Sequence, residues 1–360
     1  MAITNDYHVI GLMSGTSLDG LDIAYCRFGI NKDVWSYKIL KTDSINYSLD
    51  FKAQLKNAIY LQSHALIALH NNFGTWMGTQ VNSFISKHKL KVDFISSHGH
   101  TVLHQPEIGI TYQIGSGQHL ANSTGQKVIC DFRSNDVYHG GQGAPLVPIG
   151  DHLLFSQYEY CLNLGGISNI SYEYNNKRIA YDIAPVNMLL NHICNSIDLE
   201  YDDQGKLAKS GQLNATLLND LNSLAYYSQA IPKSMGYEWF ASKILPILER
   251  NPDTPQNLLH TAVHHITHQI AQTLSSNYNK KTTLLVTGGG AKNHFFIEIL
   301  AQKLGPSFTI VRPHEELIDH KESLIFAFMG VLKERGEINC LSSVTGATKN
   351  SSSGVIFKPA

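Results

Sequence analysis

One pattern of apolar runs and short turns occurs twice along the chain, and this repetition constrains the fold more than any other feature. In the first half, apolar runs at residues 8–13, 21–30 and 34–39 follow one another with only short polar turns between them. Such spacing predicts neighbouring antiparallel strands. Two more strands are expected at 92–96 and 128–130, each preceded by a helical pattern. The first half therefore reads β-β-β-α-β-α-β.

The second half shows the same order of predicted elements, although its sequence is not similar to that of the first. Its expected strands are 160–164, 168–174, 178–183, 283–286 and 308–311. Helices are expected at 187–197, from about 294 and from about 321, and a long helical insert precedes the fourth strand. The repeat is one of topology alone.

This repeat predicts an α/β chain with two duplicated domains. We expect domain I to comprise residues 1–133, with the segment from about 341 to 360 packing back on it, and domain II to comprise residues 134–340. Each domain has a glycine turn between its first two strands, so two backbone loops would face a central ligand cleft. Clefts between domains are preferred ligand sites.

Composition and charge argue against several classes of protein. The 360 residues carry a formal charge of −1, so no basic surplus indicates nucleic acid or an anionic membrane as a partner. No apolar run approaches the ~20 residues of a membrane span, and the start, MAITNDYHVIGLM, does not read as a secretory signal. The five cysteines are widely spaced and form no C-x-x-C pair. We therefore expect a soluble cytoplasmic protein.

The most informative segment is MSGTSLDGL, residues 13–21, between the first two predicted strands. Its glycines let several backbone N–H groups point into one concavity that binds anions. The hydroxyls of Ser14, Thr16 and Ser17 would add donors, and Asp19 could hold a metal ion. The segment lacks the lysine of a P-loop. An ordinary hairpin turn with Asp and Gly in turn positions is the alternative interpretation.

Two further glycine turns occupy related places in the second half. Gly165–Gly166 lies between the first two strands of that half, although Gly-Gly alone is common in hairpins. Gly288–Gly290 follows an apolar strand and precedes a helix, where a flat ligand can approach the backbone and the helix N-terminus favours phosphate. This second turn does not match G-x-G-x-x-G, because Asn293 stands at the last glycine position.

Two strand ends carry candidate catalytic or binding groups. Asp182 ends a predicted strand and is a candidate general base, although it could instead cap the next helix. Arg133 follows the strand at 128–130 and could clamp a phosphate or carboxylate, or form a surface ion pair. The three histidines of SSHGHTVLHQP favour a substrate-facing loop over a metal site. His264 and His268 have the i, i+4 spacing that can bind a metal on a helix, but no third ligand with suitable spacing is evident, so solvated or hydrogen-bonded histidines are expected there.

At these motifs the chain resembles the anhydro-N-acetylmuramic acid kinases of bacterial cell-wall recycling. The similarity covers nearly the whole chain and includes GLMSGTSLDGLD, SSHGHTVLHQP, CLNLGGISNI, YDIAPVN, VTGGGAKN and HKESLIFAFMG. It implies the ribonuclease H-like fold of actin and hexokinase. It also implies a reaction in which ATP, with Mg²⁺, phosphorylates O6 of 1,6-anhydro-N-acetylmuramic acid while water opens the anhydro bridge, giving N-acetylmuramic acid 6-phosphate. A homodimer is the expected assembly.

The resemblance also implies roles for individual residues. Asp182 would activate the water, and Glu322 would help to place it. Thr101 and Arg133 would bind the sugar. Asp19 would meet the Mg²⁺ that accompanies ATP. The residues expected to bind ATP are Ser14, Gly15, Thr16, Ser17, Leu18, Asp19, Gly20, Leu21, Gly165, Gly166, Gly288, Gly289, Gly290 and Asn293.

The chain departs from the family pattern at two motifs. The usual H-G-Q-T has His100 in place of glutamine, and the usual D-x-G-P-G-N has Ala184 and Val186 in place of its glycines. Two other functions are weighed against the kinase. A nucleotide-driven chaperone or filament protein of the same fold would need an appended peptide-binding domain or assembly surfaces. A nicotinamide oxidoreductase would rest on VTGGGAKN alone.

Overall fold

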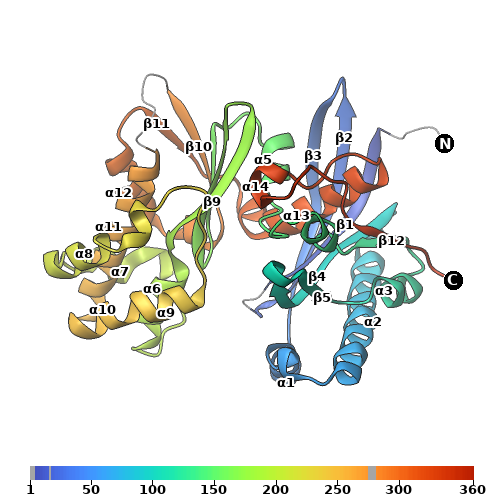
Figure 1. Cartoon of the computed structure of the whole chain (residues 1–360), viewed down its shortest axis with the longest axis horizontal. Helices are drawn as coiled ribbons and strands as arrows, with labels where there is room; N and C mark the ends of the chain where they lie inside the picture. The colour runs from blue at the N-terminus through green and yellow to red at the C-terminus, as the bar shows by residue number, and fades with distance from the viewer. Residues whose placement is uncertain (1–4, 16–17, 275–280) are drawn as a thin grey trace. The chain divides into compact units, whose positions relative to one another are not determined.

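The computed structural model describes residues 5–15, 18–274 and 281–360 and divides the chain into two compact units. Unit 1 comprises Met1–Phe155 and His320–Ala360, and unit 2 comprises Ser156–Asp319. Each unit is built on one mixed sheet with helices packed against it (Figure 1).

The sheet of unit 1 has the strand order β12-β6-β4-β1-β2-β3, and β5 pairs with β4 as a hairpin. β1 pairs antiparallel with β2 and parallel with β4, and β4 in turn pairs parallel with β6. The strands are β1 (Asp6–Ser14), β2 (Gly20–Asn31), β3 (Val34–Asn46), β4 (Phe94–Gln105), β5 (Ile110–Ile114), β6 (Val128–Cys130) and β12 (Val355–Phe357).

The helices of unit 1 bury apolar side chains against this sheet. Phe73, Met77 and Val81 of α2 recur at helical spacing and therefore lie on one face of the helix. All three are fully buried, in the same core as Ile10 and Ile95 of the strands. The helices are α1 (Leu49–Lys56), α2 (Ser63–His88), α3 (Gly117–Thr124), α4 (Ser134–Tyr138), α5 (Pro148–Leu153), α13 (Glu315–Glu334), which belongs to unit 1 from His320 onward, and α14 (Ser342–Thr345).

Helix α13 lies against β1 with almost no space between the two backbones. A Cβ on Gly11 would overlap the carbonyl oxygen of Ser323 and would lie 2.9 Å from the Cβ of Ala327. At Gly330 a Cβ would lie 2.6 Å from Oγ of Ser96, whose hydroxyl donates to the α13 backbone. Gly11 therefore lets α13 approach β1 closely, and Gly330 lets the same helix approach β4.

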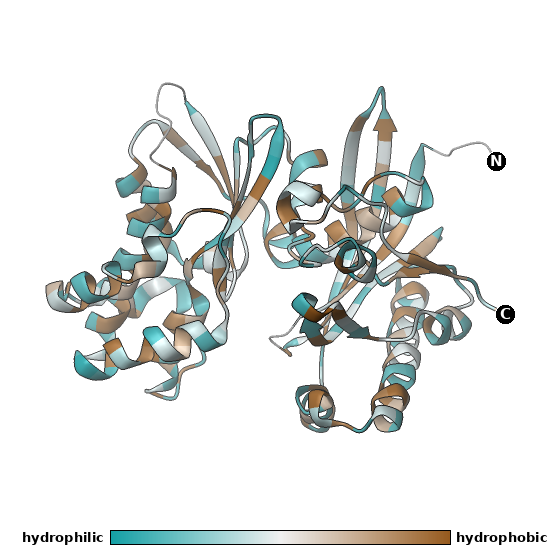
Figure 2. Ribbon diagram, in the orientation of Figure 1, coloured by the Kyte–Doolittle hydropathy of each residue, from teal (hydrophilic) through white to brown (hydrophobic). Residues whose placement is uncertain are grey.

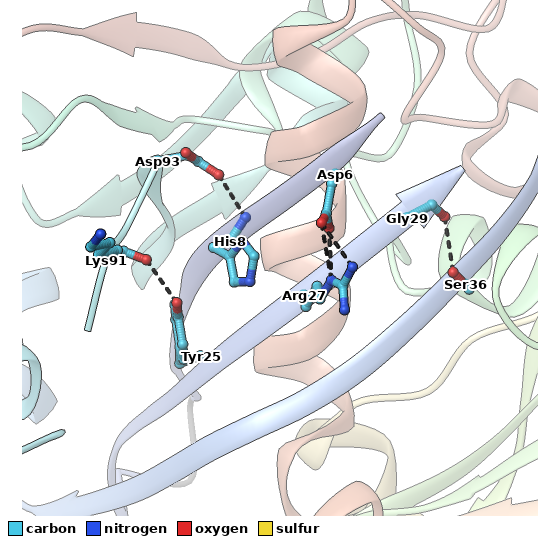
Figure 3. A network of polar contacts seen from close by, with 8 residues as sticks. All are labelled: Asp6, His8, Tyr25, Arg27, Gly29, Ser36, Lys91 and Asp93. Atoms are coloured by element: carbon cyan, nitrogen blue, oxygen red, sulfur yellow. Dashed lines mark hydrogen bonds and ion pairs between the residues drawn. The ribbon is translucent and has the colours of Figure 1, made fainter. Parts of the chain in front are cut away.

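Polar contacts connect the strands of the same sheet near the amino end of β1 (Figure 3). Arg27 of β2 donates from Nε and Nη2 to the two carboxylate oxygens of Asp6 in β1, each at 2.9 Å. The backbone N–H of His8 donates to Asp93, and the hydroxyl of Tyr25 donates to the carbonyl of Lys91. These contacts hold β1, β2 and the segment that enters β4 in register.

The sheet of unit 2 repeats the core of the first, with the order β11-β10-β7-β8-β9. β7 pairs antiparallel with β8 and parallel with β10, β8 pairs antiparallel with β9, and β10 pairs parallel with β11. The strands are β7 (Tyr160–Leu164), β8 (Ile167–Tyr174), β9 (Lys177–Pro185), β10 (Thr282–Thr287) and β11 (Phe308–Val311).

Helix α11 is the centre of the helical part of unit 2. Its residues Leu259, Ile266 and Ile270 are fully buried in the same core as Leu284 and Val286 of β10. Apolar residues are spread along the strands of both sheets (Figure 2). The helices are α6 (Asn187–Asn195), α7 (Lys206–Ser210), α8 (Ala215–Asn222), α9 (Tyr237–Lys243), α10 (Leu245–Arg250), α11 (Pro255–Leu274) and α12 (His294–Leu304).

The two strand orders, β3-β2-β1-β4-β6 and β9-β8-β7-β10-β11, are equivalent and confirm the predicted duplication of a ribonuclease H-like β-β-β-α-β-α-β unit. Some details differ. The segment around His98 and His100 is not a loop but the middle of β4, which continues to Gln105 and turns back as β5. Helix α13 begins at Glu315 and changes direction at His320, where the backbone leaves helical geometry.

The bounds of the two units also differ from the expected domains 1–133 with 341–360, and 134–340. Residues 134–155 belong with unit 1, and so does the chain from His320 onward. Close packing of α13 on β1 explains the second difference, because the helix contacts the first sheet well before residue 341.

The contact between Gly11 and α13 makes a stability prediction. Gly11→Ala should lower the free energy of unfolding by ~1–3 kcal/mol or more, since a backbone carbonyl cannot move aside as a flexible side chain can. Thermal or urea unfolding of the purified variant measures the loss. Gly29→Ala on β2 is the matched control, because there the nearest atom is the hydroxyl of Ser36 at 3.1 Å. Equal stability of the two variants would contradict this account of the packing.

Candidate active site

In unit 1, the parallel strands bring the candidate residues to one edge of the sheet. The register pairs Ser14 at the end of β1 with His100 of β4, and Ser97 of β4 with Cys130 at the end of β6. The turn after β1, the middle of β4 and Arg133 therefore lie along the carboxyl ends of neighbouring strands. In open α/β sheets this edge is the usual place for ligands.

Ser14 is buried, and its side chain is engaged within unit 1. Its Oγ accepts a hydrogen bond from the hydroxyl of Tyr47 at 2.7 Å and lies 3.1 Å from Nδ1 of His100. Burial lowers the pKa of His100 to about 4, so at neutral pH the ring is uncharged and Nδ1 can accept from Ser14. The hydroxyl expected to meet phosphate is thus already bonded. Thr16 and Ser17 lie outside the described residues.

The rest of the first glycine turn combines backbone contacts with an exposed carboxylate. The carbonyl of Gly15 accepts from the N–H of Leu18 at 3.2 Å, and Leu18 has a left-handed backbone with a φ of 61°. Asp19 is exposed, Gly20 begins β2, and the side chain of Leu21 is fully buried. Among the described residues of this turn, the backbone groups and the Asp19 carboxylate are therefore open to a ligand, and the Leu21 side chain is not.

A cluster of charged and imidazole groups surrounds Arg133. The Arg133 guanidinium donates from Nη1 to the carbonyl of Gly143 at 2.5 Å and from Nη2 to Nε2 of His98 at 2.8 Å. Desolvation lowers its pKa to about 10, and Glu322 opposes that shift. Thr101, also on β4, accepts from the side-chain amide of Gln113 at 3.3 Å. Arg133 is thus oriented by several partners and is not a loosely held surface cation.

Glu322 reaches the same region of unit 1 from α13, two residues after the change of direction at His320. The residue is exposed, yet desolvation by the protein around it raises the pKa of its carboxyl, an effect that Arg133 opposes. Its neighbour Lys321 forms a buried ion pair with Asp151, with 2.7 Å between Nζ and Oδ1. This buried pair fixes α13 next to Glu322.

Asp182 lies in β9 of unit 2, where most of its side chain is shielded from water. Its Oδ2 accepts from the backbone N–H of Met235 at 3.1 Å, and its own N–H donates to the carbonyl of Lys233 at 3.0 Å. Desolvation raises the pKa of Asp182 to about 6, against the smaller opposite effect of the Met235 hydrogen bond. A carboxylate with this pKa can accept a proton near neutral pH.

Two of the three glycines after β10, Gly289 and Gly290, line a cavity in unit 2, and Gly288 precedes them without lining it. This cavity has a volume of about 420 Å³, and Gly289, Gly290 and Asn293 line it together with Asn187. Gly288 has a φ of 81°, and a Cβ there would lie 2.5 Å from Oδ1 of Asn163. Asn293 accepts the N–H of Phe296 and so caps α12, whose N-terminus borders the cavity. Of the residues expected to bind ATP, Gly289, Gly290 and Asn293 line this cavity, whereas Gly288 does not.

The turn at Gly165–Gly166 supports the same part of unit 2. Both glycine carbonyls accept from the first residues of α6: Gly165 from the N–H of Asn187 at 3.1 Å, and Gly166 from the N–H groups of Val186 and Met188. The Asn187 side chain in turn donates to the carbonyl of Leu164 at 3.2 Å. The turn therefore holds the cavity residue Asn187 in place.

Sequence reasoning missed other residues that line this cavity, namely Tyr201, Asp202, Asp203 and Gln204. The two carboxylate oxygens of Asp202 accept from the N–H groups of Leu207 and Ala208, each at 2.9 Å, and thereby start α7. The run YDDQG between two helical patterns is a turn signal that could have located these residues. Another hollow, of about 430 Å³, lies at the amino end of β1, where Asp6 and Arg27 are paired with each other.

The described part of the chain shows neither a cluster of metal ligands nor a membrane-spanning helix. Within residues 5–15, 18–274 and 281–360, no group of three or more His, Cys, Asp or Glu side chains is arranged to hold a metal ion. Asp22, the next acid along β2 after Asp19, accepts from the hydroxyl of Ser44 at 2.6 Å. Over the same residues, no helix is both long and apolar enough to cross a membrane.

The raised pKa of Asp182 predicts a pH-dependent effect on stability. The folded state holds this proton more tightly than the unfolded state, so wild-type stability falls as pH rises from about 4 through 6. Asp182→Asn should therefore be more stable than wild type at pH 8, by up to ~3 kcal/mol. That advantage should shrink as pH approaches 4.5. Unfolding curves of both proteins across this range test it, and a constant difference would contradict the assigned burial.

Comparisons with known proteins show the family of this chain. The family model for anhydro-N-acetylmuramic acid kinase matches residues 7–359. The chain is 35% identical to the anhydro-N-acetylmuramic acid kinase of Aliivibrio fischeri, over 97% of this chain and 98% of that one. It is 33% identical to that of Vibrio cholerae with the same coverage, and 31% identical to that of Nitrosomonas europaea over 97% and 99%. The chain therefore belongs to the anhydro-N-acetylmuramic acid kinase family.

Proposed function

We propose that this kinase transfers the γ-phosphoryl group of ATP to O6 of 1,6-anhydro-N-acetylmuramic acid while water opens the anhydro bridge. The product would be N-acetylmuramic acid 6-phosphate. The observation that carries this proposal is the carboxylate of Asp182, which is desolvated, has a pKa of about 6 and is held by Met235. A reaction that needs water as a nucleophile requires such a base.

The proposed reaction balances as one addition of water and one phosphoryl transfer. Asp182 accepts a proton from a water molecule while the oxygen of that water forms a bond to C1 of the sugar. The bond from C1 to O6 breaks, and O6 bonds to the γ-phosphorus as ADP leaves. The phosphoryl step is governed chiefly by positioning and charge stabilisation. Glu322 of unit 1, whose carboxyl also has a raised pKa, would help to place the water.

ATP is assigned to backbone groups in both units. In unit 2, the cavity lined by Gly289, Gly290 and Asn293 would take the adenosine side, with Gly165, Gly166 and Gly288 behind it. In unit 1, the turn from Ser14 to Leu21 would meet the phosphates. Mg²⁺ would neutralise phosphate charge there, and the exposed carboxylate of Asp19 is the proposed ligand on this chain.

The sugar is assigned to unit 1. Arg133 and Thr101 lie along the carboxyl edge of its sheet, and a guanidinium suits the carboxylate of the muramic acid. A role in peptidoglycan recycling in the cytoplasm fits the buried cysteines and this substrate. A homodimer is proposed from the family resemblance alone. The family match favours the kinase over a chaperone, a filament protein or an oxidoreductase.

The base is tested by Asp182→Asn, which keeps the size of the side chain and an oxygen that can accept from Met235. We expect turnover to fall by ~10²–10⁴-fold, with dissociation constants for ATP and sugar changed little. That pattern marks an interaction made chiefly in the transition state. Steady-state kinetics and calorimetric binding measure the two quantities. A variant with full turnover would overturn the assignment of Asp182.

The adenosine side is tested at Gly289, where an added Cβ finds only Nδ2 of Asn187, at 3.5 Å. Gly289→Val should fold normally but occupy part of the cavity, which would raise the KM for ATP by ~10-fold or more while the KM for the sugar stays unchanged. The matched control is Gly29→Val, at a glycine of β2 in unit 1 that does not line this cavity. An unchanged KM for ATP would place the nucleotide elsewhere.

A further inference from the structure

His98 is a buried histidine that the reaction proposed above does not use. It lies in β4, 5% exposed, and its ring contacts Phe326 of α13 with 4.6 Å between ring centres. Both of its nitrogens are bonded. Nδ1 lies 2.9 Å from the carbonyl oxygen of Gly99, and Nε2 lies 3.1 Å from Nε and 2.8 Å from Nη2 of Arg133.

These partners define the tautomer of His98. A carbonyl oxygen can only accept, so Nδ1 must carry the proton that it donates to Gly99. Nε2 is then unprotonated and accepts from the Arg133 guanidinium, which can only donate. Burial and the adjacent guanidinium both lower the pKa of His98, so the ring stays neutral. A neutral imidazole thus holds one edge of the guanidinium without neutralising its charge.

Arg133 keeps part of its hydrogen-bonding capacity. Among the described residues, His98 and Gly143 engage three of its five N–H donors, those on Nε, Nη2 and Nη1. One donor on each terminal nitrogen remains. Two donors on neighbouring nitrogens can bind a carboxylate through both of its oxygens. A neutral imidazole at this edge differs from a carboxylate because it adds no negative charge beside the guanidinium.

We infer that His98 is a positioning residue that orients Arg133 so that its two remaining donors bind the carboxylate of the sugar substrate. The inference rests on the proposed function, and it names the group of the substrate that this part of unit 1 selects. His98 does not touch the sugar; it acts through Arg133. Selection for the carboxylate should therefore depend on an acceptor at the position of Nε2.

The experiment measures the dissociation constants of two sugars by calorimetry: 1,6-anhydro-N-acetylmuramic acid, and 1,6-anhydro-N-acetylglucosamine, which lacks the lactyl carboxylate. Wild type should prefer the first. His98→Leu should weaken binding of the first sugar by ~10- to 100-fold, as for a lost hydrogen bond to a charged group, and leave the second nearly unchanged. His98→Gln, whose amide oxygen can replace Nε2, should restore most of the preference.

Controls separate positioning from general disruption of the fold. In an Arg133→Met background, His98→Leu should have no further effect on sugar preference, because its partner is gone. His64→Leu, at an exposed position in α2, should leave both affinities and the ATP affinity unchanged. If His98→Leu fails to fold, His98→Gln alone still tests the acceptor, since it must keep the preference.

Two results would overturn the inference. One is an equal loss of affinity for both sugars in His98→Leu. The other is that His98→Leu weakens binding of the first sugar equally in wild type and in the Arg133→Met background. The failure of the proposed function looks different: wild type would then form no 6-phosphate from the anhydro sugar. Sugar preference in the binding assay is read independently of turnover.

Discussion

The parallel pairing of each first strand with its fourth is the constraint on which the rest of the structure depends. Because β1 pairs with β4 and β4 with β6, the turn after Ser14, the middle of β4 and Arg133 share one edge of the first sheet. In unit 2 the pairing of β7 with β10 likewise brings the turns at Gly165 and Gly288 together. The same strand order thus produces a ligand edge twice.

Desolvation then sets the chemistry of the individual groups. It raises the pKa of Asp182 to about 6, which suits a base, and lowers that of His100 to about 4, which keeps this ring a hydrogen-bond acceptor. Around Arg133, a neutral His98 orients the cation while Glu322 lies close enough to influence its pKa. These groups differ in role because their surroundings differ, a common feature of enzyme sites.

Sequence reasoning identified elements whose signals are local. Period-two and helical patterns located most strands and α2, and the glycine turns led to residues that share the cavity in unit 2. It could not find contacts between distant segments. Tyr47 and His100 meet Ser14 from 33 and 86 residues away, and burial of His98 depends on Phe326 of α13. Helix α13 starts at Glu315, earlier than expected, and the acidic residues Glu315 and Glu316 in its first turn are a local start signal that the sequence analysis did not use.

The central claim, that one reaction joins phosphoryl transfer to hydrolysis of the anhydro bridge, is tested most directly by identifying the product. Purified protein with ATP, Mg²⁺ and 1,6-anhydro-N-acetylmuramic acid should yield one ADP for each sugar consumed. By mass spectrometry, that sugar should have gained one phosphoryl group and one molecule of water. A phosphorylated sugar without the added water, or ADP with inorganic phosphate and an unchanged sugar, would contradict the account.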